Sequence, residues 1–192
     1  MDSYNFPAFL YRMKNIYRWS LMRNTEHESV ALHSYYVSIW THMLCSVANE
    51  IYKKNVPTDR VVSMALFHDA TEVFVGDIAQ PVKHSSPPIL EHFREIERAA
   101  AKTLMGMLPA ELQEVYRPLI LEHDSELYKY VKGGDLLDAY LKCVSELNAG
   151  NAEFTFAKKQ ILESLRKLEM PEVDYFLIHM APAFEKTIDE LT

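Results

Sequence analysis

The chain has 192 residues, of which 48% are apolar and 11% aromatic, so it can bury a substantial core as one domain and is not a disordered chain. The formal net charge is −7 and no cluster of Lys and Arg is present, which argues against binding to the backbone of a DNA or RNA polymer. A small anionic substrate stays compatible with this charge, because it needs only a local positive site.

The N-terminal stretch MDSYNFPAFLYRMKN lacks the basic start and the continuous apolar region of a signal peptide. Nowhere do about 18 apolar residues follow one another, as a membrane-spanning helix requires. We therefore expect a cytoplasmic protein with no membrane partner. The two cysteines, Cys45 and Cys143, fall within helical patterns and lack the Cys-x-x-Cys spacing of a zinc finger, so we expect buried thiols.

Apolar residues recur with a period of 3.6 residues through most of the chain, whereas alternating runs, hairpin signals and internal repeats are absent. The sequence therefore predicts an all-α fold. In the N-terminal half we expect helices over residues 7–17, 29–51 and 58–75, then a Pro/Ser-rich loop over 78–88 and a helix over 89–108.

The helix over residues 29–51 has an apolar face formed by residues at steps of three and four. This face consists of Val30, His33, Val37, Trp40, Leu44, Val47 and Ile51. His33 is therefore expected to point into the core among apolar neighbours.

The helix over 58–75 is apolar almost all round, which predicts that it is covered on several sides. We expect Thr58 to be its N-cap and Gly76 to end it. Within it, His68 and Glu72 would share a face, with Asp69 about 100° around the axis from His68.

Helices in the C-terminal half are expected over residues 109–118, 125–148, 150–169 and 171–191. Pro118 should bend or end the first of them, and Pro182 should interrupt the last. Gly133 and Gly134 lie inside the helix over 125–148, where each glycine costs about 1 kcal/mol relative to alanine. This cost predicts a close approach of the backbone to another element, directly before Asp135.

Four polar side chains on three helices thus fall where burial has to be explained: His33, the pair His68 and Asp69, and Asp135. A buried carboxylate is unfavourable unless it is paired or bound to a metal ion, and bundle metal sites are built by such convergence. Each signal alone has a simpler interpretation, because a core histidine is often only hydrogen-bonded and a His-Asp dipeptide is common. His123 and Asp124 repeat the dipeptide, but at a helix junction where we expect solvated side chains.

Longer motifs resemble a known family. IYRWSLMRN, SVALHSYYVS, FHDATEVFVGDIAQPVK, GDLLDAYLKC and LNAGNAEF resemble, in order and spacing, the bacterial HD-domain 5′-deoxynucleotidases, over nearly the whole chain. The resemblance implies a single HD-domain helical bundle over residues 1–192 that forms a homodimer. It also implies a metal-dependent 5′-nucleotidase that converts deoxyribonucleoside 5′-monophosphates to deoxyribonucleosides and orthophosphate.

The same resemblance implies a metal-ligand set, H…HD…D, that would hold one divalent cation. Its members in this sequence are His33, His68, Asp69 and Asp135. Two imidazoles and two carboxylates suit Co, Mn, Fe, Zn or Mg better than a metal that prefers thiolates. The sequence does not choose among these five.

For the substrate, the resemblance implies Glu72 as the catalytic carboxylate, Arg18 on the phosphate, Trp19 beside the nucleoside and Asp77 against the deoxyribose, where it helps to exclude a 2′-hydroxyl. A guanidinium can hold two phosphoryl oxygens at once. Further cations that could help to bind the substrate are Arg23 and Lys83.

The chain also departs from the family pattern. Ser20 stands where a proline is expected after Arg-Trp, and the segment HSSPPIL is richer in proline. Asp138 adds a carboxylate three residues after Asp135, where it would alter metal affinity or face away.

Two alternatives stay open at this point. The first is an HD-domain hydrolase of another nucleotide, such as a triphosphate, a cyclic dinucleotide or an alarmone. The second is a non-catalytic helical scaffold with a structural metal, which would have a closed coordination shell.

Overall fold

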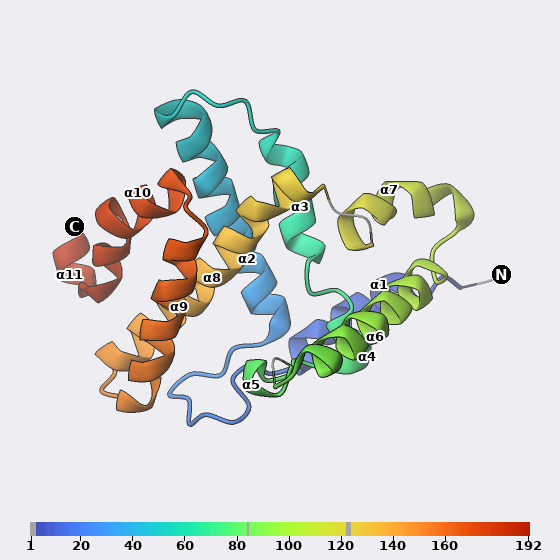
Figure 1. The fold of residues 1–192 in the computed structure, drawn as a ribbon, viewed down its shortest axis with the longest axis horizontal. Helices are drawn as coiled ribbons and strands as arrows, with labels where there is room; N and C mark the ends of the chain where they lie inside the picture. Colours follow the sequence, from blue (N-terminus) through green and yellow to red (C-terminus); the bar gives the residue numbers. More distant parts are fainter. Residues whose placement is uncertain (1–2, 84, 122–123) are drawn as a thin grey trace.

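The computed structural model describes residues 3–83, 85–121 and 124–192, and these residues form helices joined by short loops (Figure 1). The α-helices are α1 Phe6–Leu10, α2 Val30–Ser46, α3 Thr58–Phe67, α4 Glu72–Val75, α5 Gln80–Lys83, α6 Pro87–Met105, α7 Ala110–Ile120, α8 Ser125–Asn148, α9 Thr155–Lys167, α10 Pro171–His179 and α11 Ile188–Leu191. The prediction of an all-α fold is confirmed, since the described part of the chain contains no β-strand.

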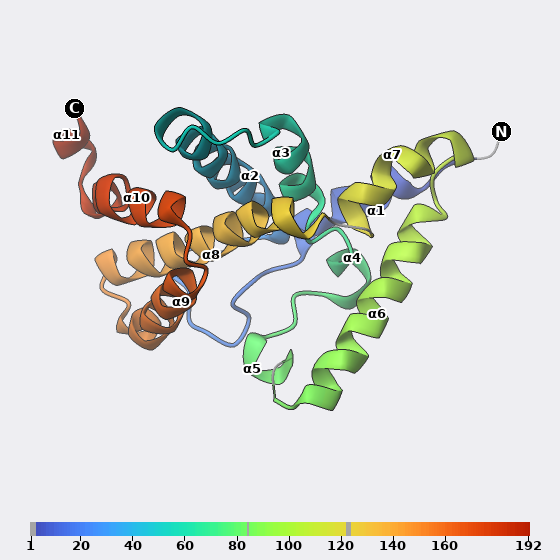
Figure 2. The ribbon, with the colours of Figure 1, turned by 45° about the horizontal axis from the view of Figure 1, so that its top comes forward.

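The centre of the molecule is the crossing of α2 and α8, against which α3 packs (Figure 1). Helices α9 and α10 cover α8 and α2 on one side, and their side chains join the main apolar core around Leu44, Met64, Leu137 and Phe176. A second apolar cluster lies on the other side, where α1, the turn before α4, α6 and α7 meet around Phe6, Ala70, Leu104 and Ile120. Figure 2 shows α6 standing apart from α9 and α10, with α4 beside it.

The close approach predicted from Gly133 and Gly134 is present where α8 crosses α2. A Cβ atom added at Gly134 would lie 2.4 Å from Oγ1 of Thr41 and 2.9 Å from the carbonyl oxygen of Val37. A Cβ atom at Gly133 would lie 2.9 Å from Cδ1 of Leu44. Only glycine allows this contact, and it brings Asp135 next to α2.

The predicted bounds of α8 are confirmed, whereas those of the helix over 58–75 are wrong. That segment is divided into α3 and α4, and the chain between them makes successive turns with hydrogen bonds from Ala70 N to Phe67 O and from Glu72 N to Asp69 O, both 3.0 Å. Thr58 is the first residue of α3 and is not its N-cap. The N-cap is Pro57, which has no side-chain oxygen to offer.

Smaller differences affect the ends of other helices. The segment 7–17 is only one short α-helix, α1, followed by a 3₁₀ turn over Tyr11–Asn15. Pro118 lies inside α7, which ends two residues later at Ile120. The interruption predicted near Pro182 is present, as a 3₁₀ turn over Ala181–Glu185. Asn151 caps a 3₁₀ turn that leads into α9.

Segment 16–30 matters for the site because it is held against the start of α2 by an isolated antiparallel bridge between Tyr17 and Ser29. The backbone N–H of Arg18 donates to the carbonyl of Glu28 over 2.9 Å. Arg18 and Glu28 are therefore fixed side by side. Across the described part of the chain, no helix combines the length and apolarity needed to span a bilayer.

Candidate functional site

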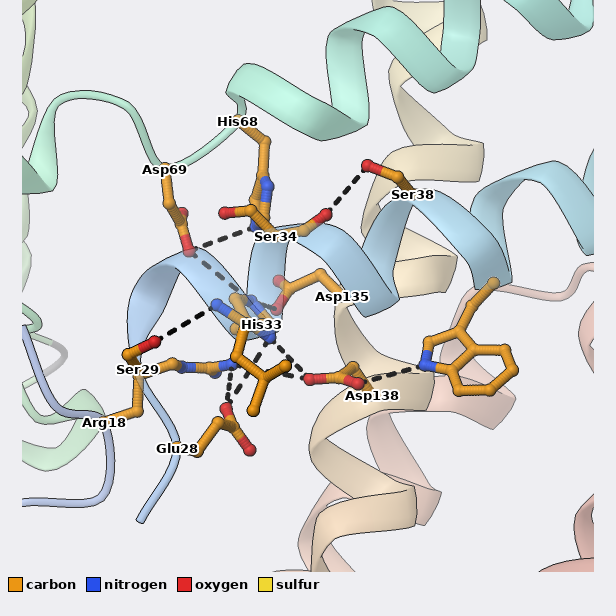
Figure 3. A network of polar contacts seen from close by, with 12 residues as sticks. Arg18, Glu28, Ser29, His33, Ser34, Ser38, His68, Asp69, Asp135 and Asp138 are labelled. Carbon is orange, nitrogen blue, oxygen red and sulfur yellow. Dashed lines mark hydrogen bonds and ion pairs between the residues drawn. The ribbon is translucent and has the colours of Figure 1, made fainter. Parts of the chain in front are cut away.

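His33 is set in place by the first turn of α2. Ser29 caps this helix, its side chain accepting a hydrogen bond from the backbone N–H of Leu32. The His33 ring is completely buried, with Nδ1 2.6 Å from Oδ2 of Asp138 and Nε2 3.4 Å from an oxygen of each of Asp69 and Asp135 (Figure 3). Since Asp138 accepts the proton of Nδ1, the other ring nitrogen is directed at two carboxylates.

His68 and Asp69 lie at the point where α3 ends. The Nδ1 of His68 lies 2.7 Å from the carbonyl oxygen of Ala65, so it donates its proton there. The Nε2 of His68 faces Oδ2 of Asp69 at 3.1 Å. The break in the helix thus turns adjacent residues toward the same point, which a continuous helix would have kept about 100° apart.

Asp135 reaches the same point from α8. The two histidine rings have their centroids 5.2 Å apart, and single ligand atoms of His33, His68 and Asp135 all lie within 4.8 Å of one another. The other oxygen of Asp135 accepts a hydrogen bond from Nζ of Lys132 over 2.6 Å. The structure therefore brings together all four ligands predicted from the sequence.

The donor set fits a divalent cation. The Nε2 atoms of His33 and His68 are buried, and neither has a hydrogen-bond partner among the described residues. Buried polar atoms without partners are rare and call for an explanation. In each ring Nδ1 is already hydrogen-bonded, which leaves Nε2 for a metal ion. Two such imidazoles together with two carboxylates are typical metal ligands in proteins.

Electrostatics keep the two carboxylates ionised, the form that binds metals. Burial acts to raise the pKa of Asp69, but His68 and His33 hold it well below its usual value. Burial also acts to raise the pKa of Asp135, but Lys132 and His33 lower it strongly.

Glu72 faces the same site from the first turn of α4. Burial raises the pKa of Glu72 to about 9, and the neighbouring Asp69 and Asp77 add to the shift. Its Oε2 atom is buried and has no hydrogen-bond partner among the described residues. A carboxyl group that keeps its proton near neutral pH can act as a general acid.

A cavity of about 400 Å³ extends from these residues toward α6. Its inner wall includes Arg18, His68, Asp69, Glu72, Asp77, Lys132 and Asp135. The rest of its lining mixes apolar side chains, among them Phe93, Ile96 and Val131, with the charged side chains of Lys83, Arg94, Glu97 and Arg98. The volume lies within the usual range for small-molecule sites, and the inner wall is strongly polar.

Arg18 enters the cavity although its side chain is only 13% exposed. Its NH1 atom donates to Oε1 of Glu28 over 2.9 Å and lies 3.8 Å from Oδ2 of Asp138. Burial acts to lower the pKa of Arg18, but the surrounding carboxylates, Glu28 first among them, raise it. The guanidinium is thus a fixed positive charge at the cavity.

Trp19 lies outside the cavity wall, whereas Asp77 is part of it. Trp19 has a left-handed backbone, with φ 58°, and its ring packs against Phe154 at a centroid distance of 5.4 Å, away from the cavity wall. Asp77 lines the cavity directly after Gly76, whose φ of 73° lets the chain turn there. Burial raises the pKa of Asp77, while Arg18 opposes that shift.

Four further residues that the sequence singled out are placed as follows. Arg23 does not line the cavity; its side chain is 92% exposed and pairs with Glu153 at 2.6 Å. Lys83 does line the cavity and pairs with Glu97 at 2.5 Å. His123 lies outside the described residues, and Asp124 caps α8 by accepting from the backbone N–H groups of Glu126 and Leu127.

Sequence reasoning missed the polar residues that surround the ligands. Glu28, Trp40 and Lys132 received no role, although each pairs with a site residue in the structure. The spacing of three residues from Asp135 drew attention to Asp138 but did not predict which way the Asp138 side chain points. The structure directs it to His33, away from the cavity wall.

Comparison with known proteins agrees with this arrangement. A family model described as 5′-deoxynucleotidase YfbR-like matches residues 5–184. The chain is 42% identical over 190 residues to a 5′-deoxynucleotidase from Photorhabdus temperata, covering 98% of this chain and 96% of that protein. It is 41% identical over 194 residues to a 5′-deoxynucleotidase from Vibrio vulnificus, covering 100% of both.

Solved structures share the fold. An HD-domain phosphohydrolase from Listeria innocua matches with a TM-score of 0.83 and 28% identity, over 94% of this chain and 88% of that one. A cyanophage S-2L HD phosphohydrolase, DatZ, bound to dA and one catalytic Zn²⁺ ion, matches with a TM-score of 0.66 and 20% identity, over 94% of this chain and 96% of that one. The prediction of an HD-domain helical bundle is thereby confirmed.

Proposed function

The chain belongs to the YfbR-like 5′-deoxynucleotidase family, and from that membership we propose how its own residues hydrolyse a deoxyribonucleoside 5′-monophosphate to a deoxyribonucleoside and orthophosphate. The observation that carries this proposal is the convergence of His33, His68, Asp69 and Asp135 at the polar end of a cavity large enough for a mononucleotide.

These four residues would hold one divalent cation. In such a site a cation supplies positive charge to the phosphoryl oxygens and lowers the pKa of water. The buried Nε2 atoms of His33 and His68 support this assignment, because both lack a hydrogen-bond partner among the described residues and face carboxylates of the site. Any of Co, Mn, Fe, Zn and Mg suits the donor set.

Arg18 binds the phosphate. A phosphomonoester is dianionic at neutral pH, and a guanidinium can contact two of its oxygens. The salt bridge to Glu28 holds Arg18 at the cavity before substrate arrives, so less side-chain entropy is lost on binding. Lys132, which lies beside Asp135, adds a second positively charged side chain to the same cavity wall.

Glu72 handles the proton as general acid/base, toward the attacking water or the leaving 5′-oxygen. Its buried Oε2, which has no hydrogen-bond partner among the described residues, and its place on the cavity wall with Asp69 and Asp77 support this role. Asp77 faces the sugar and disfavours a 2′-hydroxyl. Trp19 does not line the cavity, and we assign it a structural role: its left-handed backbone and its packing on Phe154 shape the segment that follows Arg18.

A pair of variants tests the site. His68→Ala removes one ligand, and the matched control His92→Ala removes an exposed histidine on α6. We expect His68→Ala to lose most of its bound metal and nearly all orthophosphate release from dAMP while its circular dichroism stays helical. His92→Ala should match the unmodified protein. Undiminished turnover by His68→Ala would contradict the assignment.

We also propose that residues 1–192 act as one domain, as a homodimer, in the cytoplasm where nucleotides are turned over. Exposed apolar side chains near the C-terminus, among them Ile178 at 66% and Ile188 at 74% exposure, support self-association. Sedimentation equilibrium tests the dimer: a monomer mass at micromolar concentration would contradict it.

A further inference from the structure

Asp138 is a buried carboxylate that does not line the cavity. It lies one turn along α8 from Asp135 and is 6% exposed. One oxygen, Oδ2, lies 2.6 Å from Nδ1 of His33, and the other, Oδ1, accepts a hydrogen bond from Nε1 of Trp40 over 3.0 Å (Figure 3). Each oxygen thus has one hydrogen-bond partner, and both of these partners are side chains of α2; NH1 of Arg18 also lies 3.8 Å from Oδ2.

The geometry gives Asp138 a definite effect on His33. An ionised carboxylate only accepts hydrogen bonds, so the proton of the neutral imidazole must lie on Nδ1. The lone pair is then on Nε2, the nitrogen that faces Asp69 and Asp135. A carboxylate behind a ligating histidine also raises its basicity and fixes the angle of the ring.

Among the described residues, Glu28 is a second carboxylate that approaches Nδ1 of His33, and it is less well placed. Its Oε1 lies 3.8 Å from Nδ1 of His33 but 2.9 Å from NH1 of Arg18. The two carboxylates therefore have different main partners. Glu28 holds the arginine, and Asp138 holds the histidine.

Trp40 determines how Asp138 presents its oxygens. The Trp40 ring stacks on Tyr36 and meets Phe176 edge-on, so its Nε1 has a fixed position. Because that N–H engages Oδ1, the carboxylate cannot rotate without breaking a partly buried hydrogen bond.

We propose that Asp138 is a positioning residue for the metal centre: held by Trp40, it fixes the tautomer and orientation of His33 so that Nε2 is presented to the cation. The inference rests on the proposed role of His33 as a ligand. It would explain why this chain carries a second buried aspartate one turn beyond Asp135.

The first test is the affinity of the metal-stripped protein for Co²⁺, measured by calorimetric titration. Asp138→Asn keeps the shape but removes the charge, and Trp40→Phe keeps an aromatic ring but removes the Nε1 donor. We expect affinity to fall about 10- to 100-fold in Asp138→Asn and by less in Trp40→Phe. The exposed Asp174→Asn on α10 is the control and should bind as the unmodified protein does.

The second test reads the hydrogen bond itself, by proton NMR of the Zn²⁺-loaded, ¹⁵N-histidine-labelled protein. We expect a His33 Nδ1 proton far downfield that moves upfield in Asp138→Asn, with the signal assigned by its loss in His33→Ala. An unchanged proton shift and unchanged Co²⁺ affinity in Asp138→Asn would overturn the positioning role alone. Absence of metal binding by the unmodified protein would overturn the metal site and the positioning role together.

Discussion

Each histidine at the site uses one ring nitrogen to hold its place and directs the other at carboxylates of the site. His33 is held by Asp138 and His68 by the carbonyl of Ala65, both through Nδ1. Metal-ligating histidines commonly have such a partner behind them. The two buried Nε2 atoms, which have no hydrogen-bond partner in the described part of the chain, are therefore a feature of the protein itself, because the fold orients both rings.

Glu72 gives the sharpest prediction at the scale of single residues. Glu72→Gln keeps the size of the side chain and removes its ability to exchange a proton. General acid/base catalysis contributes about 10²- to 10⁴-fold, so kcat for dAMP should fall by that factor. Bound metal, measured by elemental analysis, should stay at the unmodified level, since Glu72 is not among the four ligands.

The control for this experiment is Glu95→Gln, which changes an exposed glutamate on α6 and should leave kcat unchanged. If Glu72→Gln kept kcat within a few-fold of the unmodified protein, the catalytic role would have to pass to another group.

At the scale of elements, the α2–α8 crossing depends on Gly134. Gly134→Ala places a Cβ atom 2.4 Å from Oγ1 of Thr41 and 2.9 Å from a backbone oxygen of α2, so the helices must separate. Overpacking of this kind typically costs about 1–3 kcal/mol. Urea unfolding followed by circular dichroism should show that loss, and metal affinity should fall too because Asp135 moves with α8.

The matched control is Gly106→Ala at the end of α6. A Cβ atom there meets nothing closer than 3.5 Å, and the backbone is already helical, so stability should stay the same or rise by a few tenths of a kcal/mol. Equal stability of Gly134→Ala and Gly106→Ala would contradict the close packing.

The elements of this chain could be predicted in part from the sequence. The bounds of α8 and the glycine contact were predicted correctly, because a long amphipathic pattern and a pair of interior glycines are local signals. The break between α3 and α4 was not predicted. Residues 68–75 have no proline, and the glycine at position 76 comes only after α4, so the turn depends on tertiary contacts of the buried Ala70 and on the polar site itself.

The site could likewise be predicted only where the signal is local. The four proposed ligands stand out as polar residues in apolar patterns, and the structure brings them together. Glu28 and Trp40 carry no such signal, since glutamate in a loop and tryptophan on an apolar stripe are ordinary. Their roles follow from contacts between α2, α8 and segment 16–30, which no local pattern encodes.

Across the whole molecule, the site lies where two apolar clusters meet. Leu119 packs against both clusters, and cavity residues come from α4, α6 and α8. The loop that carries Arg18 is tied to the far end of α8 through Glu146, which is 1% exposed and accepts hydrogen bonds from Thr25 and Asn151. Lys142 also donates to Glu146.

This tie predicts a pH dependence of stability. Burial acts to raise the pKa of Glu146, but its hydrogen bonds, with that from Lys142 first, lower the pKa to about 2 from an unfolded value of 4.5. A lowered folded-state pKa adds stability above pH 4.5 that is lost as the pH falls toward 2, on the order of 2–3 kcal/mol. Urea unfolding from pH 7 to pH 3 should show this loss.

Glu146→Gln should be less stable than the unmodified protein at pH 7 and should approach it at pH 3. The exposed Glu163→Gln on α9 serves as the comparison and should follow the unmodified protein throughout. If the free energy of unfolding differed between Glu146→Gln and the unmodified protein by the same amount at every pH in this range, the stabilisation would not come from ionised Glu146.

We propose that one metal site, formed by residues of this chain, hydrolyses deoxyribonucleoside 5′-monophosphates. The most direct measurement is orthophosphate release by the metal-stripped protein, resupplied with Co²⁺, Mn²⁺, Mg²⁺ or Zn²⁺ in turn and offered dAMP, AMP and 3′-dAMP. We predict no orthophosphate release without metal, rapid release from dAMP with at least one ion, and little release from AMP or 3′-dAMP. Release that does not depend on metal, or equal rates on all three nucleotides, would contradict the proposal.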